Sequence, residues 1–228
     1  MAGDYEAFRV SASECVACPL HKTRNQVVVD RGNPKAAVAF VGTSPGYAED
    51  QTGQAFLGKA GKYLDDLIAE EDLEACFLYV LKCKPPGGAF PGDKRSTLGT
   101  DVVKKCLPLL DQQIGLISPK VVVLVGKKAA QWLLFRGRGR VESMGVLTSN
   151  WYRSGDYPGM EFFVIYHPGF LARKQEEDPD SAEEIGEAIR SVISRAADAS
   201  RGKWPRKTQP IVVPSISFKR NTRQGTLF

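Results

Sequence analysis

The chain has 228 residues, of which 43% are hydrophobic and 25% charged; this is the composition of a globular protein with one sizeable core, and it excludes collagen-like and disordered chains. It contains no run of 18 apolar residues and begins with the acidic segment MAGDYEAFRV, so we expect neither a membrane span nor a secretion signal and predict a cytoplasmic protein. The net charge of +5 depends on residues 201–228, which hold seven lysines and arginines and no acid, whereas residues 1–200 alone carry a net charge of −2.

Short apolar strands and amphipathic helices alternate along the chain. Strands are predicted at 38–42, 77–81, 121–125 and 162–166. Helices are predicted at 58–71, at 102–116 with an interruption at Pro108, at 127–135 and at 181–200, and residues 84–100 are predicted to form a loop. Four continuously apolar strands separated by helices predict an α/β fold with a four-stranded, mostly parallel sheet covered on both faces.

Ligands of such sheets bind outside the carboxyl ends of the strands, so the segments that follow the strands are the candidate site. Gly42-Thr-Ser-Pro-Gly46 is a tight turn whose backbone can approach a ligand, or else a plain connection from strand to helix. Glu49 and Asp50 follow it, as a base or as holders of a water, unless they only cap the next helix. His167 ends the last strand, either as a catalytic group or as a core histidine.

Five cysteines in a chain without a secretion signal point to metal or redox chemistry rather than to disulfides. Cys15 and Cys18 form a C-x-x-C pair, and Cys83 and Cys106 would complete four soft ligands, with Cys76 left over. Such a set suits zinc or an iron–sulfur cluster, and the spacing alone does not decide between these two and a chain without metal.

Taken together and in this order, the segments resemble the iron–sulfur uracil-DNA glycosylases of family 4. The resemblance covers residues 11–175 and rests on Cys15-x-x-Cys18-Pro-Leu, Arg31-Gly-Asn-Pro34, GTSPGYAEDQTGQAFLGKAGKYLD, LKCKPPGG, Cys106 and the HPG of 167–169. It implies a three-layer α/β/α sandwich in which Cys15, Cys18, Cys83 and Cys106 ligate a [4Fe–4S] cluster. It also implies a monofunctional DNA repair enzyme, which we expect to be a monomer, that flips uracil out of DNA and hydrolyses the N-glycosidic bond to leave an abasic site.

The resemblance also assigns roles to side chains. His167 would stabilise the departing base anion, and Phe56 would stack on the flipped base. A carboxylate would orient the attacking water, and apolar side chains after His167 would wedge into the vacated base stack. The predicted residues are His167, Asp50, Glu49 and Ser44 for catalysis; Phe56, Tyr79, Thr43, Gly42 and Gly46 for base binding; and Phe170, Leu171 and Arg173 for DNA contact.

Two positions depart from the family pattern. Thr43 stands where the family has an acid, and Tyr79 stands where it has an asparagine, four residues before the third cysteine. An asparagine amide offers uracil one donor and one acceptor, a pair that a tyrosine hydroxyl cannot reproduce. We therefore expect a glycosylase with a broader base preference that includes other deaminated bases.

Two other classes of protein fit parts of the pattern. One is an iron–sulfur protein that binds damaged or abasic DNA without turnover, which Thr43 and Tyr79 favour. The other is a zinc-stabilised nucleic-acid module without catalysis.

We predict a catalytic domain over residues 1–200 and a basic, extended tail over residues 201–228. The tail either contacts nucleic acid or an acidic partner, or only adds solubility. Its last residues, Gln224-Gly-Thr-Leu-Phe228, resemble the Q-x-x-L-F peptide with which bacterial repair and polymerase proteins dock on the sliding clamp; the alternative is an ordinary frayed terminus. An acidic patch precedes the tail and consists of Glu176, Glu177, Asp178, Asp180, Glu183, Glu184 and Glu187.

Overall fold

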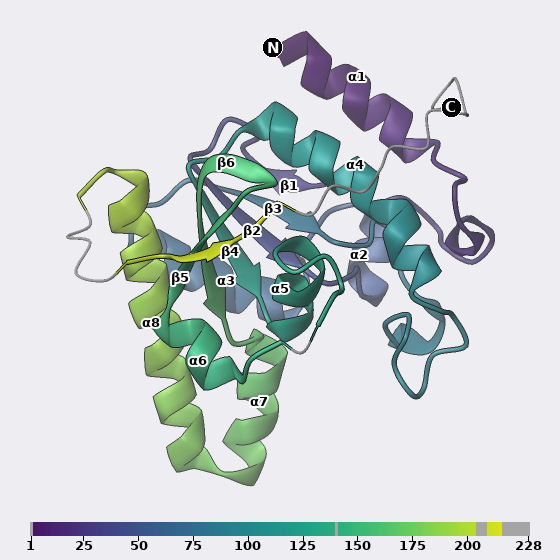
Figure 1. The fold of residues 1–228 in the computed structure, drawn as a ribbon. Helices are drawn as coiled ribbons and strands as arrows, with labels where there is room; N and C mark the ends of the chain where they lie inside the picture. Colours follow the sequence, from purple (N-terminus) through teal and green to yellow (C-terminus); the bar gives the residue numbers. More distant parts are fainter. Residues whose placement is uncertain (1, 140, 204–208, 216–228) are drawn as a thin grey trace.

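The computed structural model of the chain describes residues 2–139, 141–203 and 209–215 (Figure 1). The strands are β1 (Arg31–Gly32), β2 (Val38–Gly42), β3 (Ala75–Tyr79), β4 (Val121–Val125), β5 (Trp151–Ser154), β6 (Tyr157–Ile165) and β7 (Ile211–Val213). The α-helices are α1 (Ala2–Ser13), α2 (Tyr47–Thr52), α3 (Lys59–Glu70), α4 (Asp101–Ile117), α5 (Lys127–Leu133), α6 (Met144–Ser149), α7 (Pro168–Glu177) and α8 (Pro179–Ser200). Two short 3-10 helices, η1 (Pro19–Lys22) and η2 (Pro86–Gly88), lie in the connections.

One sheet of seven strands forms the centre of the molecule, in the order β1-β3-β2-β4-β6-β5-β7. The four strands β3, β2, β4 and β6 are parallel neighbours. β1 and β5 pair antiparallel with β3 and β6, and β7 runs parallel to β5 at the edge. The α/β fold with a parallel centre is confirmed. The predicted count of four strands is wrong, because three additional short strands, β1, β5 and β7, extend the sheet outside that parallel centre.

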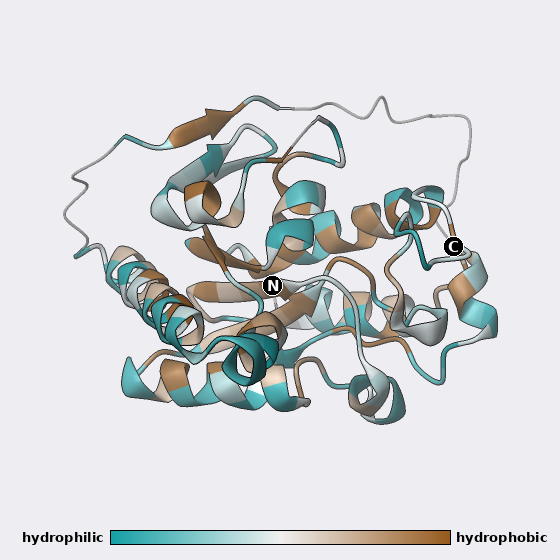
Figure 2. Cartoon of the chain, turned by 90° about the horizontal axis from the view of Figure 1, so that it is seen from below, coloured by the Kyte–Doolittle hydropathy of each residue, from teal (hydrophilic) through white to brown (hydrophobic). Residues whose placement is uncertain are grey.

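Side chains along the central strands alternate between two cores. In β2, Ala39 and Val41 face one core, and Val38 and Phe40 face the other. The first core is covered by α1, α4 and α5, and the second by α3, α7 and α8. Figure 2 shows the hydrophobic strands between helices that carry hydrophilic residues along their lengths. The three-layer arrangement therefore follows from the period of two along each strand.

Most predicted elements lie close to their predicted positions. β2 and β4 have the predicted bounds, whereas β3 begins and ends two residues earlier than expected. α4 continues through Pro108 to Ile117 instead of being interrupted. α7, which begins directly after His167, was not predicted, and β7 comes from the segment predicted as a tail.

The predicted clamp-binding residues Gln224–Phe228 lie outside the described residues. Within the described part of the chain, none of the helices has both the length and the apolar character needed to cross a bilayer.

Candidate active site and cysteine cluster

The carboxyl ends of the parallel strands bring the predicted site residues to one edge of the sheet. Gly42 ends β2, and a Cβ added there would lie 2.6 Å from Cζ of Phe56 and 2.8 Å from Cε1 of Tyr79. Gly126 follows β4 with φ +90°, and a Cβ there would lie 3.3 Å from Cβ of His167. Both glycines therefore allow aromatic or imidazole side chains to approach the strand ends closely.

The aromatic rings of Phe56 and Tyr79 stack on each other at this edge. Their centroids are 4.7 Å apart and their planes differ by 11°. The Phe56 backbone N–H donates to the Tyr79 hydroxyl at 3.0 Å, and Phe77 contacts Phe56 with a centroid distance of 5.4 Å. Phe56 is only 2% exposed, so a base can stack on its ring only if Tyr79 moves.

Phe56 has an unusual backbone conformation that neighbouring groups hold in place. Its φ is +55°, in the left-handed region that is unfavourable for a bulky residue. Arg31 donates through Nε to the carbonyl of Ala55 at 2.7 Å and through Nη2 to that of Phe56 at 3.2 Å. Arg31 also pairs with Asp65 on α3. In the sequence, Arg31 stands out only as part of the motif Arg31-Gly-Asn-Pro34. Its contacts with the segment around Phe56 could not be predicted, because they join residues 24 to 34 positions apart.

Glu49 closes the loop between α2 and α3. Its Oε1 accepts from the backbone N–H groups of Leu57 and Gly58, both at 3.0 Å, and its Oε2 accepts from that of Gly46 at 3.0 Å. A carboxylate that accepts three amide hydrogen bonds fixes the path of the backbone through residues 46–58. Glu49 therefore positions the segment that carries Phe56.

Asp50 is fully buried and ties α2 to the segment before β1. Its Oδ1 accepts from the backbone N–H of Asn25 at 3.1 Å, and its Oδ2 accepts from the Asn25 side-chain amide at 2.6 Å. Both carboxylates that the sequence offers as water-orienting groups thus accept hydrogen bonds from protein donors. Each oxygen with a single donor retains a lone pair.

The turn between β2 and α2 is joined to the residues that follow β3. The Val80 and Leu81 N–H groups donate to the carbonyls of Gly42 and Thr43, both at 2.9 Å. Ser44 is half-buried in this turn, and Gly46 is exposed at its end. The turn is therefore held in place by backbone hydrogen bonds to the segment after β3.

His167 caps α7 with its ring. Nδ1 accepts from the backbone N–H of Gly169 at 3.0 Å, so in the neutral imidazole the proton resides on Nε2. Burial, and secondarily the nearby Arg173, lower the pKa of His167, which favours the neutral ring. The structure thus presents a neutral imidazole whose Nε2–H is its donor, the form needed to stabilise a departing anion without a prior protonation.

The three predicted DNA-contact residues differ in exposure. Leu171 is buried in the core beneath α7 and α8. Phe170 is half-buried and stacks on Tyr166 with a centroid distance of 6.1 Å, and the exposed Arg173 lies 5.9 Å from the Phe170 ring. Arg173 is therefore at the surface and Phe170 is partly exposed, whereas Leu171 packs into the core.

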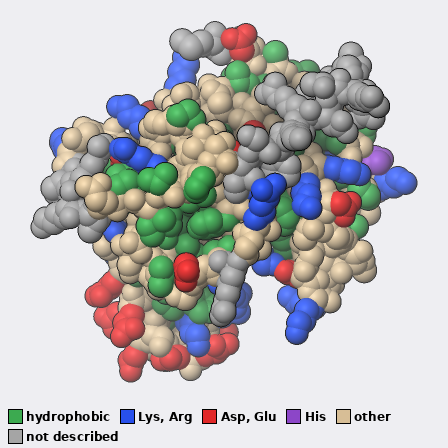
Figure 3. Space-filling model, in the orientation of Figure 1, with side chains coloured by type: hydrophobic (Ala, Val, Ile, Leu, Met, Phe, Trp, Pro, Cys, Tyr) green, Lys and Arg blue, Asp and Glu red, His purple; other side chains and the backbone are tan. Residues whose placement is uncertain are grey.

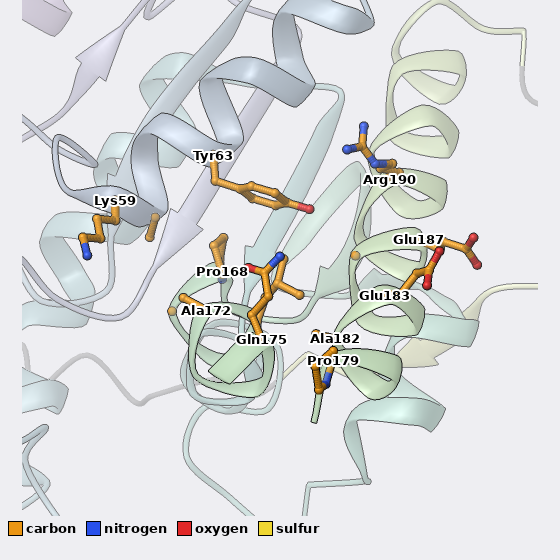
Figure 4. A pocket seen from close by; sticks show the side chains of 14 residues that line it. Lys59, Tyr63, Pro168, Ala172, Gln175, Pro179, Ala182, Glu183, Glu187 and Arg190 are labelled. Atoms are coloured by element: carbon orange, nitrogen blue, oxygen red, sulfur yellow. The ribbon is translucent and has the colours of Figure 1, made fainter. Parts of the chain in front are cut away.

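A groove of about 770 Å³ lies beside this segment, between α3 and the α7–α8 pair (Figure 4). Pro168 and Gly169 line it next to His167, and Tyr63 points into it from α3. Glu183 and Glu187 of α8 form part of its opposite wall. The groove therefore adjoins the candidate site at the start of α7.

Four of the five cysteines are electrostatic neighbours. Cys18 interacts with Cys15, Cys83 with both of these, and Cys106 with Cys18 and Cys83. Cys76 lies apart from this set, near Asp30 and Lys82. These interactions link the same four cysteines that the sequence analysis offers as ligands, which come from the segment after α1, the segment after β3 and the middle of α4.

Cys83 and Cys106 are buried, whereas Cys15 and Cys18 are half-buried. Burial raises the pKa of Cys83 to about 11 and that of Cys106 to about 12, so both are neutral thiols unless a metal displaces their protons. Arg24 Nη1 donates to Sγ of Cys83 at 3.5 Å, and the Lys82 backbone N–H donates to Sγ of Cys106 at 3.4 Å. Such N–H···S bonds are typical of sulfur ligands of iron–sulfur clusters.

The donor set fits an iron–sulfur cluster by its chemistry, because four cysteine thiolates are the usual ligands of such a cluster, although four thiolates also suit zinc. Over the described ranges, no three histidine, cysteine or acidic side chains are grouped tightly enough to hold one metal ion.

Comparisons with known proteins agree with this site. Residues 29–191 match the family model described as the uracil DNA glycosylase superfamily. A type-4 uracil-DNA glycosylase of Archaeoglobus fulgidus is 33% identical over 76% of this chain and 87% of its own length. Type-4 uracil-DNA glycosylases of Pyrobaculum aerophilum and Thermotoga maritima are 31% and 30% identical, over 75% and 72% of this chain and 86% and 81% of their own lengths.

Proposed function

The chain belongs to the uracil DNA glycosylase superfamily, in its type-4 branch. We propose that it is a DNA repair glycosylase that excises uracil and other deaminated bases. It hydrolyses the N-glycosidic bond and leaves an abasic site, as a monofunctional enzyme. The observation that carries the proposal is the neutral, Nε2-protonated His167 at the carboxyl edge of the sheet.

His167 acts on the leaving group. When the bond between base and sugar breaks, the electron pair stays with the base, which leaves as an anion while positive charge develops on the sugar. The Nε2–H of His167 donates to the base oxygen on which this charge gathers. Because Nδ1 already accepts from Gly169, the ring is oriented before the substrate binds.

Water completes the hydrolysis by adding to the sugar carbon. We assign its orientation to Glu49 together with the Ser44 hydroxyl, with Asp50 as the other carboxylate that this role admits. Glu49 keeps 6% of its surface exposed and one oxygen with a single donor, whereas Asp50 has no exposed surface. Glu49 is therefore the carboxylate better placed for a water.

The base is held between the turn 42–46 and the aromatic pair. Phe56 stacks on the flipped base after Tyr79 has moved off its ring, and backbone groups of Gly42, Thr43 and Gly46 line the floor. Tyr79 provides no paired donor and acceptor, since its hydroxyl is one group with one proton. This supports a base preference broader than uracil alone.

The cysteine set holds a [4Fe–4S] cluster in this proposal. Cys15, Cys18, Cys83 and Cys106 are its ligands, and the cluster supplies a covalent link between the N-terminal segment, the sheet and α4. Cys76 is not a ligand. The catalytic steps above use none of these residues.

The remaining surfaces contact DNA and a protein partner. Phe170, supported by Leu171, enters the vacated base stack, and Arg173 lies near phosphate. The pentapeptide 224–228 docks on a sliding clamp, with Leu227 and Phe228 in an apolar pocket and Gln224 at its rim. The enzyme works as a monomer, in the cytoplasm where such a clamp encircles DNA.

The test is a base-release assay with the purified full chain. Oligonucleotides that carry uracil, hypoxanthine, xanthine or a thymine mismatch are incubated with the protein, and abasic sites are then cleaved with alkali. We expect cleavage at uracil and at one or more of the other deaminated bases. Binding to these oligonucleotides without any alkali-sensitive site would contradict the proposal.

A further inference from the structure

Lys82 is a buried cation that the proposed mechanism does not use. It lies directly before Cys83, and its side chain is 1% exposed. Its ammonium donates to the carbonyl of Val29 at 3.4 Å and to Oε1 of Gln113. Both partners are neutral oxygens, which hydrogen-bond the ammonium without balancing its charge.

The nearest acid is engaged elsewhere. The Tyr5 hydroxyl donates to Oδ2 of Asp30 at 2.6 Å, and Arg9 Nε lies 3.6 Å from the same oxygen. Gln113 connects the two ends of this network, because its Nε2 donates to the Tyr5 hydroxyl at 2.9 Å. Within the part of the chain that the structure describes, Lys82 forms no ion pair with a carboxylate.

The cysteine set also lies near Lys82. Among the ionisable groups around it, Cys106 interacts with the ammonium most strongly, followed by Asp30, Cys76 and Cys83. The Lys82 backbone N–H donates to Sγ of Cys106 at 3.4 Å. With neutral thiols, the buried ammonium would depend on Asp30, which Tyr5 and Arg9 already engage, and such partial compensation is unfavourable. Four thiolates around an iron–sulfur core carry net negative charge, which would compensate it.

We propose that the Lys82 ammonium is the buried counter-charge of the thiolate-ligated cluster and that it determines how readily the cluster is oxidised and lost. This inference rests on the proposed [4Fe–4S] cluster. A nearby positive charge favours the oxidation state with more electrons, so its removal makes oxidation easier. Lys82 is a positioning and electrostatic residue here, since it does not touch the substrate.

The experiment compares iron-loaded wild-type protein with Lys82→Gln, which removes the charge and keeps a side-chain amide donor. Ferricyanide accepts one electron at a time from the cluster, and loss of the visible absorbance reports oxidation and breakdown. We expect Lys82→Gln to bleach roughly tenfold faster than the wild type. Tyr5→Phe is the matched control, because it breaks the same buried network without removing a charge, and we expect it to bleach at the wild-type rate.

Each outcome decides the inference. Equal bleaching rates for Lys82→Gln and wild type, or equally fast bleaching of Tyr5→Phe, would overturn it. If Lys82→Gln does not fold, Lys82→Arg serves as the second variant. Iron-loaded protein from Lys82→Arg but not from Lys82→Gln supports a role of the charge. If neither variant folds, the role of Lys82 is in packing, and the inference is overturned. Wild-type protein without iron would contradict the cluster proposal itself, whereas an iron-loaded wild type matched by Lys82→Gln contradicts only the inference.

Discussion

The carboxylate of Glu49 accepts three backbone hydrogen bonds, and the exchange Glu49→Gln would turn one of its oxygens into a donor that faces an N–H group. We expect the free energy of unfolding to fall by about 1–3 kcal/mol, because a buried amide is left without an acceptor. Single-turnover excision of uracil should fall as well, since the segment that carries Phe56 loses its support. Urea unfolding and rapid-quench kinetics measure the two effects.

Asp50→Asn is the matched variant for Glu49→Gln, because Asp50 is buried like Glu49 and its carboxylate accepts two hydrogen bonds. It should lower the free energy of unfolding without a comparable loss of the excision rate in the folded protein. A larger loss of rate for Asp50→Asn than for Glu49→Gln would assign the water to Asp50 instead.

His167→Ala should lower the single-turnover rate of uracil excision about 10²–10³-fold, because a donor to the departing anion is lost. Burial lowers the pKa of His167 below its ordinary value of 6.5, so the neutral ring persists as the pH falls through that value. The wild-type rate should therefore show no titration step near pH 6.5. Tyr166→Phe is the control, and an unchanged rate in His167→Ala would show that the assigned role is incorrect.

The ring of Tyr79 covers the Phe56 ring, and its hydroxyl accepts a hydrogen bond from the Phe56 backbone N–H. The ring and the hydroxyl of Tyr79 can therefore be tested separately. Tyr79→Asn removes the ring and adds a paired donor and acceptor, and we expect it to shift the preference toward uracil over xanthine and hypoxanthine. Tyr79→Phe should keep the wild-type preference and lose about 1 kcal/mol of stability. Competition assays with mixed substrates measure the preference; the same ratio in all three proteins would exclude Tyr79 from base selection.

At the scale of elements, β2 and β4 could be predicted because their sequences are continuously apolar and a glycine ends or follows each strand. β2 and β4 are flanked by parallel strands on both sides, so nothing but burial shapes their sequence. α7 carried a signal that the prediction missed, since Pro168 at its first position, directly after His167, is a typical helix start. The sequences of β1 and β7 carry no such signal. Strands of two or three residues at a sheet edge form because of their pairing with the neighbouring strand.

The candidate site was also predictable only in part, because some of its contacts are local in the sequence and others join distant residues. The strand ends identified the loops after β2, β3 and β6, because topology brings them to one edge. The support of Phe56 by Arg31 and of α2 by Asn25 depends on contacts between distant residues, which no local pattern encodes. The stacking of Tyr79 on Phe56 likewise joins residues that are 23 positions apart.

The cysteines join elements that are otherwise separate, and this gives a prediction at this scale. Cys15→Ala and Cys83→Ala should each lose iron and visible colour and unfold at lower temperature, because the link between the segment after α1 and the sheet is broken. Cys76→Ala is the control within the same core, and it should keep its iron, measured by a colorimetric iron assay. A colourless, iron-free wild type that is folded and active would contradict the proposed cluster.

The distribution of charge orients the whole molecule relative to DNA. Acidic side chains gather at the tip of α7 and α8, at the lower left of Figure 3. α7 has ten residues and is thus about 15 Å long, so its N-terminal end beside His167 is separated from this acidic tip. We therefore expect DNA to approach the candidate site at the N-terminal end of α7, although Glu183 and Glu187 of α8 line the adjoining groove.

The end of the chain gives the last prediction, which concerns recruitment rather than catalysis. Truncation after Arg223 removes Gln224–Phe228 and retains all seven basic residues beyond position 200, so it separates docking on a clamp from attraction to DNA. Leu227 and Phe228 are the two large apolar residues of the pentapeptide, and loss of two such anchors should weaken binding to purified sliding clamp at least about tenfold. Excision from short oligonucleotides should be unchanged, because no clamp takes part. Surface plasmon resonance on immobilised clamp compares the full and truncated chains, with Thr226→Ala as the control inside the peptide; equal binding by both chains, or none by either, would show that the pentapeptide is not a clamp ligand.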